Sequence, residues 1–427
     1  MKEINIDIVN EKLFYEKLDN GLEIYMVPNK KVKNIYATFT TRYGSIHDEF
    51  IPIGENKMVK VPLGIAHFLE HKMFEQEDGI DPFNFFSKSG ADSNAHTSLK
   101  NTTYEFTGPN KFLENLEFLL DFVQHPYLTD ENIEKEKGII EQELKMYMDD
   151  PFWSMYDGIR NNIFIKNPTK YPIGGTIESV RKITKKDLLR CYKTFYHPSN
   201  MFLVITGNFD PEETIKHIKE NQSNKKYEKL TPVKLKEYKE PDKVVKSREV
   251  VEKNTDTPKL SYGIKINLEK TGYKDYRRRD MYLNIIFDLA FGITSKFYEE
   301  MNSKGYLSSS IDIDKVYTET HLLVNLICET NLPNELIKEI ENMINNLSID
   351  ECELNIIKNK FISNYINLFD NIVALNDTIV TNIIDYGNFD YNYIDNINSL
   401  TINELNNVIN RLDLNNTSYY IVKPFGD

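Results

Sequence analysis

The stretch "LGIAHFLEHKMFEQ", residues 63–76, places two histidines and a glutamate among apolar side chains. On a helix, His67 and His71 lie one turn apart on the same face, and Glu70 lies beside them. Both imidazoles can then approach one metal ion, while the carboxylate reaches a water molecule next to it. The alternative is a pair of core histidines. Burying unpaired polar groups is costly, however, and a metal satisfies all three at once.

A catalytic zinc site takes three protein ligands and a water molecule, so a third ligand is expected. The stretch "TDENIEKEKGIIEQELKMYMDDP", 129–151, predicts a long helix that Thr129 or Asp130 caps and that ends at the final proline. On this helix Glu136 and Glu143 are seven residues apart and share a face with Ile140 between them. The pair supplies a carboxylate for the metal or, alternatively, forms a half-exposed helix flank.

The remaining pattern predicts both strands and helices along the whole chain. Asn20-Gly21 lies between two apolar runs and predicts a tight hairpin. Residues 221–258 are rich in Lys, Glu and Pro, as in an interdomain linker with an edge strand or two. We therefore expect one domain at 1–220, this linker, and a second domain at 259–427. The order of elements after the linker resembles the order before it, so a divergent duplication is expected.

Composition narrows the class of protein further. The chain has 427 residues, enough for two domains of roughly 200 residues each. Its formal net charge of −13 argues against nucleic acid as a partner, because phosphate binding favours a basic surface. Three scattered cysteines indicate a reducing compartment. We find neither a signal-peptide pattern nor an apolar run long enough to span a membrane, so we expect a soluble cytoplasmic protein.

Two motifs of this chain are also found in a known protein family. "HFLEH" is the inverted zinc motif His-x-x-Glu-His, and it precedes the glutamate-rich helix that contains Glu143. This pairing resembles the pitrilysin/insulinase family of metallopeptidases. The likeness extends over nearly the whole chain, and the length resembles the short two-domain subfamily related to mitochondrial processing peptidase. It rests also on the stretches "LDNGLEIYMVPN", "SGADSNAHTSLKNTTYEF" and "FGITSKFYEEMNSKGYLSSSID".

The resemblance implies a role for each polar residue of the two motifs. His67, His71 and Glu143 become the ligands of Zn²⁺, and Glu70 becomes the general base of a zinc metalloendopeptidase. Glu136 becomes a carboxylate that orients a ligand or tunes its basicity. The implied fold class is α+β, with two homologous α/β-sandwich domains that face each other as a clamshell and the zinc in the first domain. The second half has no His-x-x-Glu-His motif.

Substrate and partner expectations also follow from the resemblance. Asn94 and Ala95 would lie on an edge strand that pairs with the backbone of an extended peptide. Tyr306 would bind substrate from the second domain, although "FYEEMNSKGYLSSS" lacks the arginine that often accompanies it. Because this half-site is incomplete, we expect a homo- or heterodimer with a related chain. Two other functions stay open, a non-catalytic or partner-dependent subunit of such a peptidase, and a zinc hydrolase of a non-peptide amide.

Overall fold

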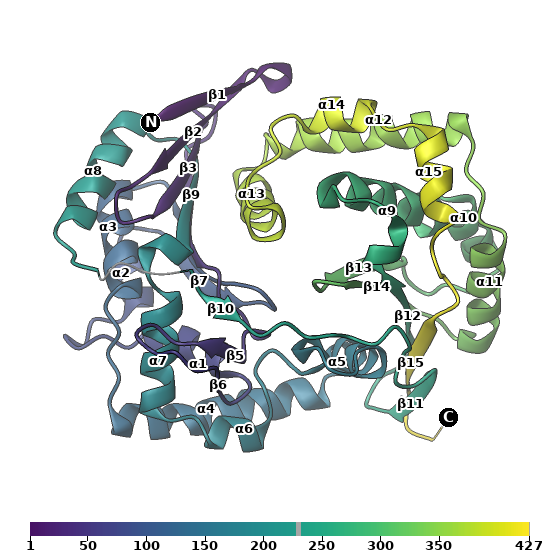
Figure 1. Ribbon diagram of the computed structural model, residues 1–427, viewed down its shortest axis with the longest axis horizontal. Coiled ribbons are helices and arrows are strands. Elements are labelled where there is room, and N and C mark those ends of the chain that lie inside the picture. Colours follow the sequence, from purple (N-terminus) through teal and green to yellow (C-terminus); the bar gives the residue numbers. More distant parts are fainter. Residues whose placement is uncertain (228–231, 427) are drawn as a thin grey trace. The chain divides into compact units, whose positions relative to one another are not determined.

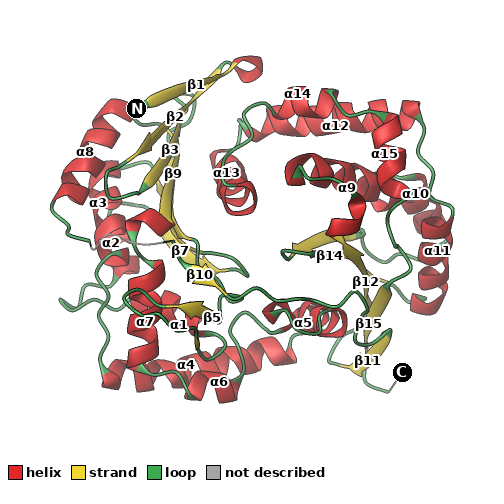
Figure 2. Cartoon of the chain, in the orientation of Figure 1, coloured by secondary structure: helices red, strands yellow, loops and turns green. Residues whose placement is uncertain are grey.

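The computed structural model describes residues 1–227 and 232–426 (Figures 1 and 2). Contacts divide the chain into two units, neither of which is one continuous segment. Unit 1 comprises Met1–Gln142, Ile173–Lys236 and Asn364–Asn392; unit 2 comprises Glu143–Pro172, Glu237–Ser363 and Tyr393–Asp427. Each unit combines helices with a mixed sheet, which confirms the α+β class.

Unit 1 has, among its described residues, a seven-stranded sheet in the order β1-β2-β3-β9-β4-β8-β7. Strands β3 and β9 run parallel, and the other neighbours run antiparallel. The hairpin between β2 and β3 turns at Asn20-Gly21 as predicted, and Gly21 takes a φ of 92° that favours glycine. The strands are β1 (Lys2–Ile6), β2 (Glu11–Lys17), β3 (Glu23–Pro28), β4 (Ile35–Thr41), β7 (Asp92–Thr97), β8 (Thr102–Gly108) and β9 (Met201–Gly207).

The two faces of this sheet differ in polarity. Along β4, Ala37 and Phe39 point to one face, while Thr38 and Thr40 point to the other. Helices α3 and α13 lie on opposite sides of the sheet (Figure 1). Unit 1 also has a small sheet of β5 (Glu49–Ile51), β6 (Val59–Lys60) and β10 (Lys234–Leu235). Its helices are α1 (Ile65–Met73), α2 (Pro82–Ser87), α3 (Phe112–Val123), α6 (Ile177–Arg181), α7 (Lys185–Phe195), α8 (Pro211–Ser223) and α13 (Ile372–Tyr386).

Helix α13 is bound to the polar face through Asn376, which is fully buried. Its side-chain oxygen accepts a hydrogen bond from the Thr38 hydroxyl at 2.7 Å. Its amide donates to the backbone carbonyls of Tyr36 at 3.2 Å and Val204 at 3.1 Å. A helix from the C-terminal half of the chain is therefore an integral part of unit 1.

Unit 2 has, in the part of the chain that is described, a five-stranded sheet in the order β11-β15-β12-β14-β13. Helix α5 packs on β12 and β15 so closely that a Cβ on Gly158 would lie 2.2 Å from the Tyr420 ring. The strands are β11 (Arg248–Glu252), β12 (Lys259–Asn267), β13 (Asp312–Tyr317), β14 (His321–Glu329) and β15 (Thr417–Lys423). The helices are α5 (Pro151–Ile163), α9 (Tyr276–Phe291), α10 (Lys296–Ser303), α11 (Pro333–Asn345), α14 (Tyr393–Asn398) and α15 (Ile402–Ile409).

The two sheets share one topology, which supports the predicted duplication. The order β3-β9-β4-β8-β7 in unit 1 has the same pattern as β11-β15-β12-β14-β13 in unit 2. In each series the first pair is parallel and the rest are antiparallel. Helices α5 and α13 follow the long helices α4 (Asp130–Asp149) and α12 (Glu351–Leu368), and each belongs to the unit built mainly from the other half of the sequence.

The linear boundaries at 220 and 259 stay a prediction, because the contact-based units are interleaved along the chain. Within the predicted linker, 221–258, the described residues form the end of α8 and the short strands β10 and β11. Residues 228–231 of that range lie outside the described residues.

Candidate metal centre

The start of helix α1 is fixed by Gly64, which packs closely against the backbone of Gly174. Gly64 precedes the helix with a φ of 83°, and a Cβ there would lie only 2.1 Å from the Gly174 carbonyl oxygen. Only glycine fits this conformation and this close approach. Phe68 and Leu69 are fully buried on the core side of α1. The start of the helix and its rotation about the axis are therefore both set by packing.

Helix α4 supplies the carboxylates. The Thr129 hydroxyl accepts the backbone N–H of Asn132 at 3.1 Å, so of the two predicted caps Thr129 makes this bond. Ile140 is fully buried on the inner face, and Glu136 is only 6% exposed. Glu143 lies two turns after Glu136. The first segment of unit 1 ends at Gln142, and unit 2 begins at Glu143. Helix α4 is nevertheless continuous through this point.

His67, His71 and Glu143 converge in space. One potential ligand atom from each lies within 4.8 Å of the other two, and all three side chains are partly buried. The imidazole rings meet edge to face, with centroids 4.6 Å apart. Among the described residues no other group of three such side chains meets this criterion. Two imidazole nitrogens and one carboxylate oxygen are a ligand set typical of catalytic zinc, so the residues fit a divalent metal.

Glu136 contacts this group through His71. Its Oε1 lies 2.9 Å from His71 Nδ1. Burial alone raises the pKa of Glu136, but the hydrogen bond to His71 and the nearby positive charge of Lys72 outweigh it and lower the pKa. An ionised carboxylate can only accept, so Nδ1 of His71 donates, and in the neutral ring Nε2 is left as the ligand atom. The role of Glu136 in orienting His71 for a metal stays a prediction.

Glu70 lies on α1 between the two histidines and is 8% exposed. Its Oε2 accepts a hydrogen bond of 2.6 Å from the hydroxyl of Thr97, the last residue of β7. Thr97 was not predicted from the sequence, because a threonine at the end of a strand carries no distinctive pattern.

Lys72 was also missed, although a lysine inside the apolar run of α1 is visible in the sequence. Its side chain is fully buried, pairs with Glu75 at 2.6 Å and donates to the Asn132 carbonyl at 3.3 Å. This second contact joins α1 to the first turn of α4. The two helices that carry the candidate metal ligands are thus joined beside the site.

Strand β7 is the last strand of the unit 1 sheet as described, and it pairs with β8 on one side. Asn94 and Ala95 lie on it as predicted from the resemblance. The backbone N–H of Ala95 donates to the side-chain oxygen of Asn94 at 2.9 Å. A local side chain thus occupies the position that a neighbouring strand's carbonyl would take. The role of both residues in binding substrate stays a prediction.

Tyr306 lies in unit 2, just after α10. Its ring is half-buried against the unit 2 core, and the Lys304 ammonium lies 5.9 Å from the ring centroid. These contacts give the aromatic ring a structural role that does not depend on a substrate. Contact between Tyr306 and a peptide substrate stays a prediction.

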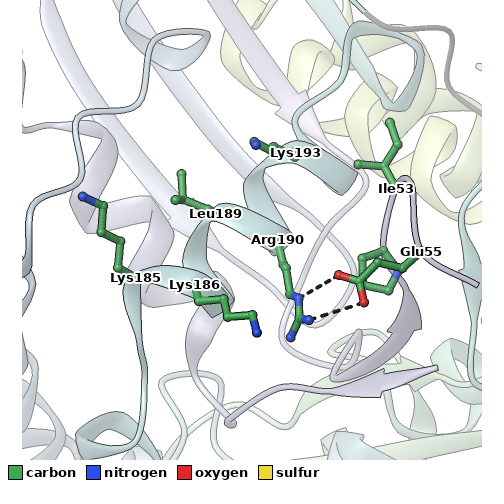
Figure 3. A pocket seen from close by; sticks show the side chains of 8 residues that line it. Ile53, Glu55, Lys185, Lys186, Leu189, Arg190 and Lys193 are labelled. Carbon is green, nitrogen blue, oxygen red and sulfur yellow. Dashed lines mark hydrogen bonds and ion pairs between the residues drawn. The ribbon is translucent and has the colours of Figure 1, made fainter. Parts of the chain in front are cut away.

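Unit 1 also has an open pocket between α7 and the loop that follows β5 (Figure 3). Two guanidinium nitrogens of Arg190 donate to the two carboxylate oxygens of Glu55, at 2.9 and 3.3 Å. The remaining lining is Pro52, Ile53, Lys185, Lys186, Leu189 and Lys193. None of the metal-centre residues is among them, so the pocket is chemically separate from that centre.

Comparison with known proteins places these observations in a family. Residues 51–177 match the family model described as "Insulinase (Peptidase family M16)", and residues 182–361 match "Peptidase M16 inactive domain". "Uncharacterized zinc protease YmfH" of Bacillus subtilis (strain 168) is 42% identical over 345 residues, 81% of this chain and 80% of the relative. The beta subunit of the mitochondrial-processing peptidase of Caenorhabditis elegans is 30% identical over 173 residues, 39% of this chain and 37% of that subunit.

The fold matches as well. The crystal structure of a putative M16-like peptidase from Alicyclobacillus acidocaldarius superposes with a TM-score of 0.91 at 32% identity, covering 97% of this chain and 98% of that one. The match confirms the predicted fold class. None of the helices within the described residues has both the length and the apolar composition needed to cross a membrane.

Proposed function

Because the chain belongs to the insulinase family of peptidases, M16, we propose that it is a zinc-dependent endopeptidase that cleaves oligopeptides or unfolded peptide segments. The observation that carries the proposal is the convergence of His67, His71 and Glu143 within 4.8 Å, with Glu70 on the same helix as both histidines. Relatives named zinc proteases support zinc as the metal. The family and this set of residues together support the proposed peptidase activity.

Each of these residues has a separate role in the proposed reaction. His67, His71 and Glu143 would hold the zinc, which in such sites lowers the pKa of water and polarises a carbonyl group. Glu70 takes the proton from the attacking water and passes it to the amine that leaves. Glu136 holds the His71 ring in its ligand tautomer through the 2.9 Å contact.

The edge of β7 is the proposed docking site for the peptide backbone. A substrate strand would pair with β7 through main-chain hydrogen bonds, which give affinity with little demand on side chains. Its carbonyl would replace the Asn94 side chain on the Ala95 N–H, the bond that measures 2.9 Å here. Such docking selects extended or unfolded segments, since a folded substrate has no free strand to offer.

A non-catalytic or partner-dependent subunit is the second candidate. The match of residues 182–361 to a family model described as an inactive domain favours it, as does the likeness to a relative named as a subunit. The presence of Glu70 favours the active enzyme, because a subunit without catalytic duty has no need of a general base. A dimer with a related chain stays part of the proposal, and size measurement of the purified protein tests it.

Glu70→Gln tests the proposal directly. The variant should bind zinc as the wild type does, but it should lose roughly 10²–10⁴-fold in kcat on a mixed peptide library read by mass spectrometry. Glu77→Gln is the matched control, because Glu77 lies six residues after His71 with its side chain 73% exposed. A Glu70→Gln variant as fast as wild type would refute the general-base role. Zinc-loaded wild type that cleaves only with a related chain added would favour the second candidate.

A further inference from the structure

The proposed general base is held by a side chain from a different element of the fold. Thr97 Oγ1 donates to Glu70 Oε2 at 2.6 Å, a short bond of the charge-assisted kind when the carboxylate is ionised. In the part of the chain that the structure describes, no other hydrogen bond to the Glu70 carboxylate is found. The carboxylate has rotatable bonds of its own, so this single bond from β7 restricts its orientation on α1.

The proton of the Thr97 hydroxyl is committed to this bond. Thr97 Oγ1 also lies 3.2 Å from Thr102 Oγ1, but the Thr102 hydroxyl donates to the Tyr43 carbonyl at 2.9 Å. Each hydroxyl carries one proton. The hydrogen bond of 2.6 Å therefore runs from the Thr97 hydroxyl to the Glu70 carboxylate. The network therefore runs in one direction, with Thr97 as donor to Glu70.

Thr97 also belongs to the strand edge proposed to receive the substrate. The Ser98 N–H points toward β8, where it donates to the Asn101 carbonyl at 2.8 Å. Backbone groups alternate in direction along an antiparallel strand, so those of Thr97 and Ala95 point away from β8. The bond from the Ala95 N–H to its neighbouring side chain agrees with this direction. A peptide paired with β7 would thus restrain the residue whose side chain holds the base.

We propose that Thr97 is a positioning residue for Glu70, holding the carboxylate of the general base from the strand edge proposed to receive the peptide. The inference rests on the proposed peptidase function. Thr97 acts through Glu70 and takes no part in proton transfer itself. Its loss should therefore slow turnover while leaving zinc binding and peptide affinity in place.

The test replaces Thr97 with valine, which keeps the shape and removes the hydroxyl, and with serine, which keeps the hydroxyl. Thr97→Val should lower kcat by roughly ten- to hundredfold, the effect of one charge-assisted hydrogen bond, with KM within about threefold of wild type. Thr97→Ser should stay within about threefold in both constants. Thr107→Val, on β8 and the opposite face, is the matched control and should leave both constants unchanged.

Two readouts do not depend on turnover. Zinc content should be equal in wild type and Thr97→Val. In a Glu70→Gln background, adding Thr97→Val should change neither the peptide Kd nor the residual rate, because the base that Thr97 positions is already gone. The inference would be overturned if Thr97→Val kept the kcat of the wild type, or if Thr97→Ser lost as much kcat as Thr97→Val. The peptidase proposal would stand in either case. A zinc-loaded wild type that cleaves no peptide would instead overturn the proposed function.

Discussion

Glu136→Gln isolates the contribution of one buried charge to metal binding. The side chain is 6% exposed, and its Oε1 lies 2.9 Å from His71 Nδ1. Glutamine keeps the shape and an acceptor oxygen but loses the negative charge. A charge-assisted hydrogen bond contributes about 1.5–3 kcal/mol and a neutral one about 0.5–1.5 kcal/mol, so the expected loss is about 1–1.5 kcal/mol. Zinc affinity should then fall roughly tenfold, at 1.4 kcal/mol per factor of ten.

The assay is competition for zinc with a chelator of known affinity, at constant pH. Glu136→Ala, which removes the acceptor altogether, should lose more, roughly up to a hundredfold. Glu141→Gln is the control on the same helix, because its carboxylate binds Arg181 instead of the metal centre. An unchanged zinc affinity in both Glu136 variants would contradict the role assigned to this carboxylate. So would a loss in Glu141→Gln as large as in Glu136→Gln.

Two further predictions concern stability. Asn376→Ala leaves the Thr38 hydroxyl and two sheet carbonyls without their bond to α13, so it should cost about 2 kcal/mol and lower Tm by roughly 4–8 °C. Thr381→Ala, on the exposed side of α13, should leave Tm nearly unchanged. Burial, aided by the positive charge of Lys100, lowers the pKa of His47 to about 4. Protonation therefore favours the unfolded chain, and Tm should fall as pH drops from about 6.5 toward 4. His47→Asn, which keeps an acceptor but does not titrate, should flatten that fall.

The sequence was sufficient for the local part of the site. His67 and His71 are four residues apart on one helix, so their proximity follows from helix geometry alone. The hairpin at Asn20-Gly21 followed in the same way from a turn preference. Glu143 was different, because periodicity placed it on a face with Glu136 but could not say what that face meets. Its assignment depended on the resemblance to a family.

Contacts between distant segments could not be read from the sequence. Thr97 reaches Glu70 across 27 residues, and nothing in the pattern of β7 distinguishes it from the other small polar residues of that strand. Lys72 did stand out as a charge inside an apolar run, but its partner Asn132 lies 60 residues away. Such pairs depend on how strands and helices pack. The periodicity of one segment does not indicate which other segment it packs against.

The interleaving of the two units affects how the site can be studied. Asn376 binds Thr38 across 338 residues of sequence, and α13 covers the polar face of the sheet that carries β7. Removing residues 364–392 would expose the polar sheet face and leave the buried Thr38 hydroxyl without its partner. Cutting the chain within 221–258 would remove α13 from unit 1 and α5 from unit 2. Because burial of each sheet depends on a helix from the other half, the metal centre has to be tested in the full chain.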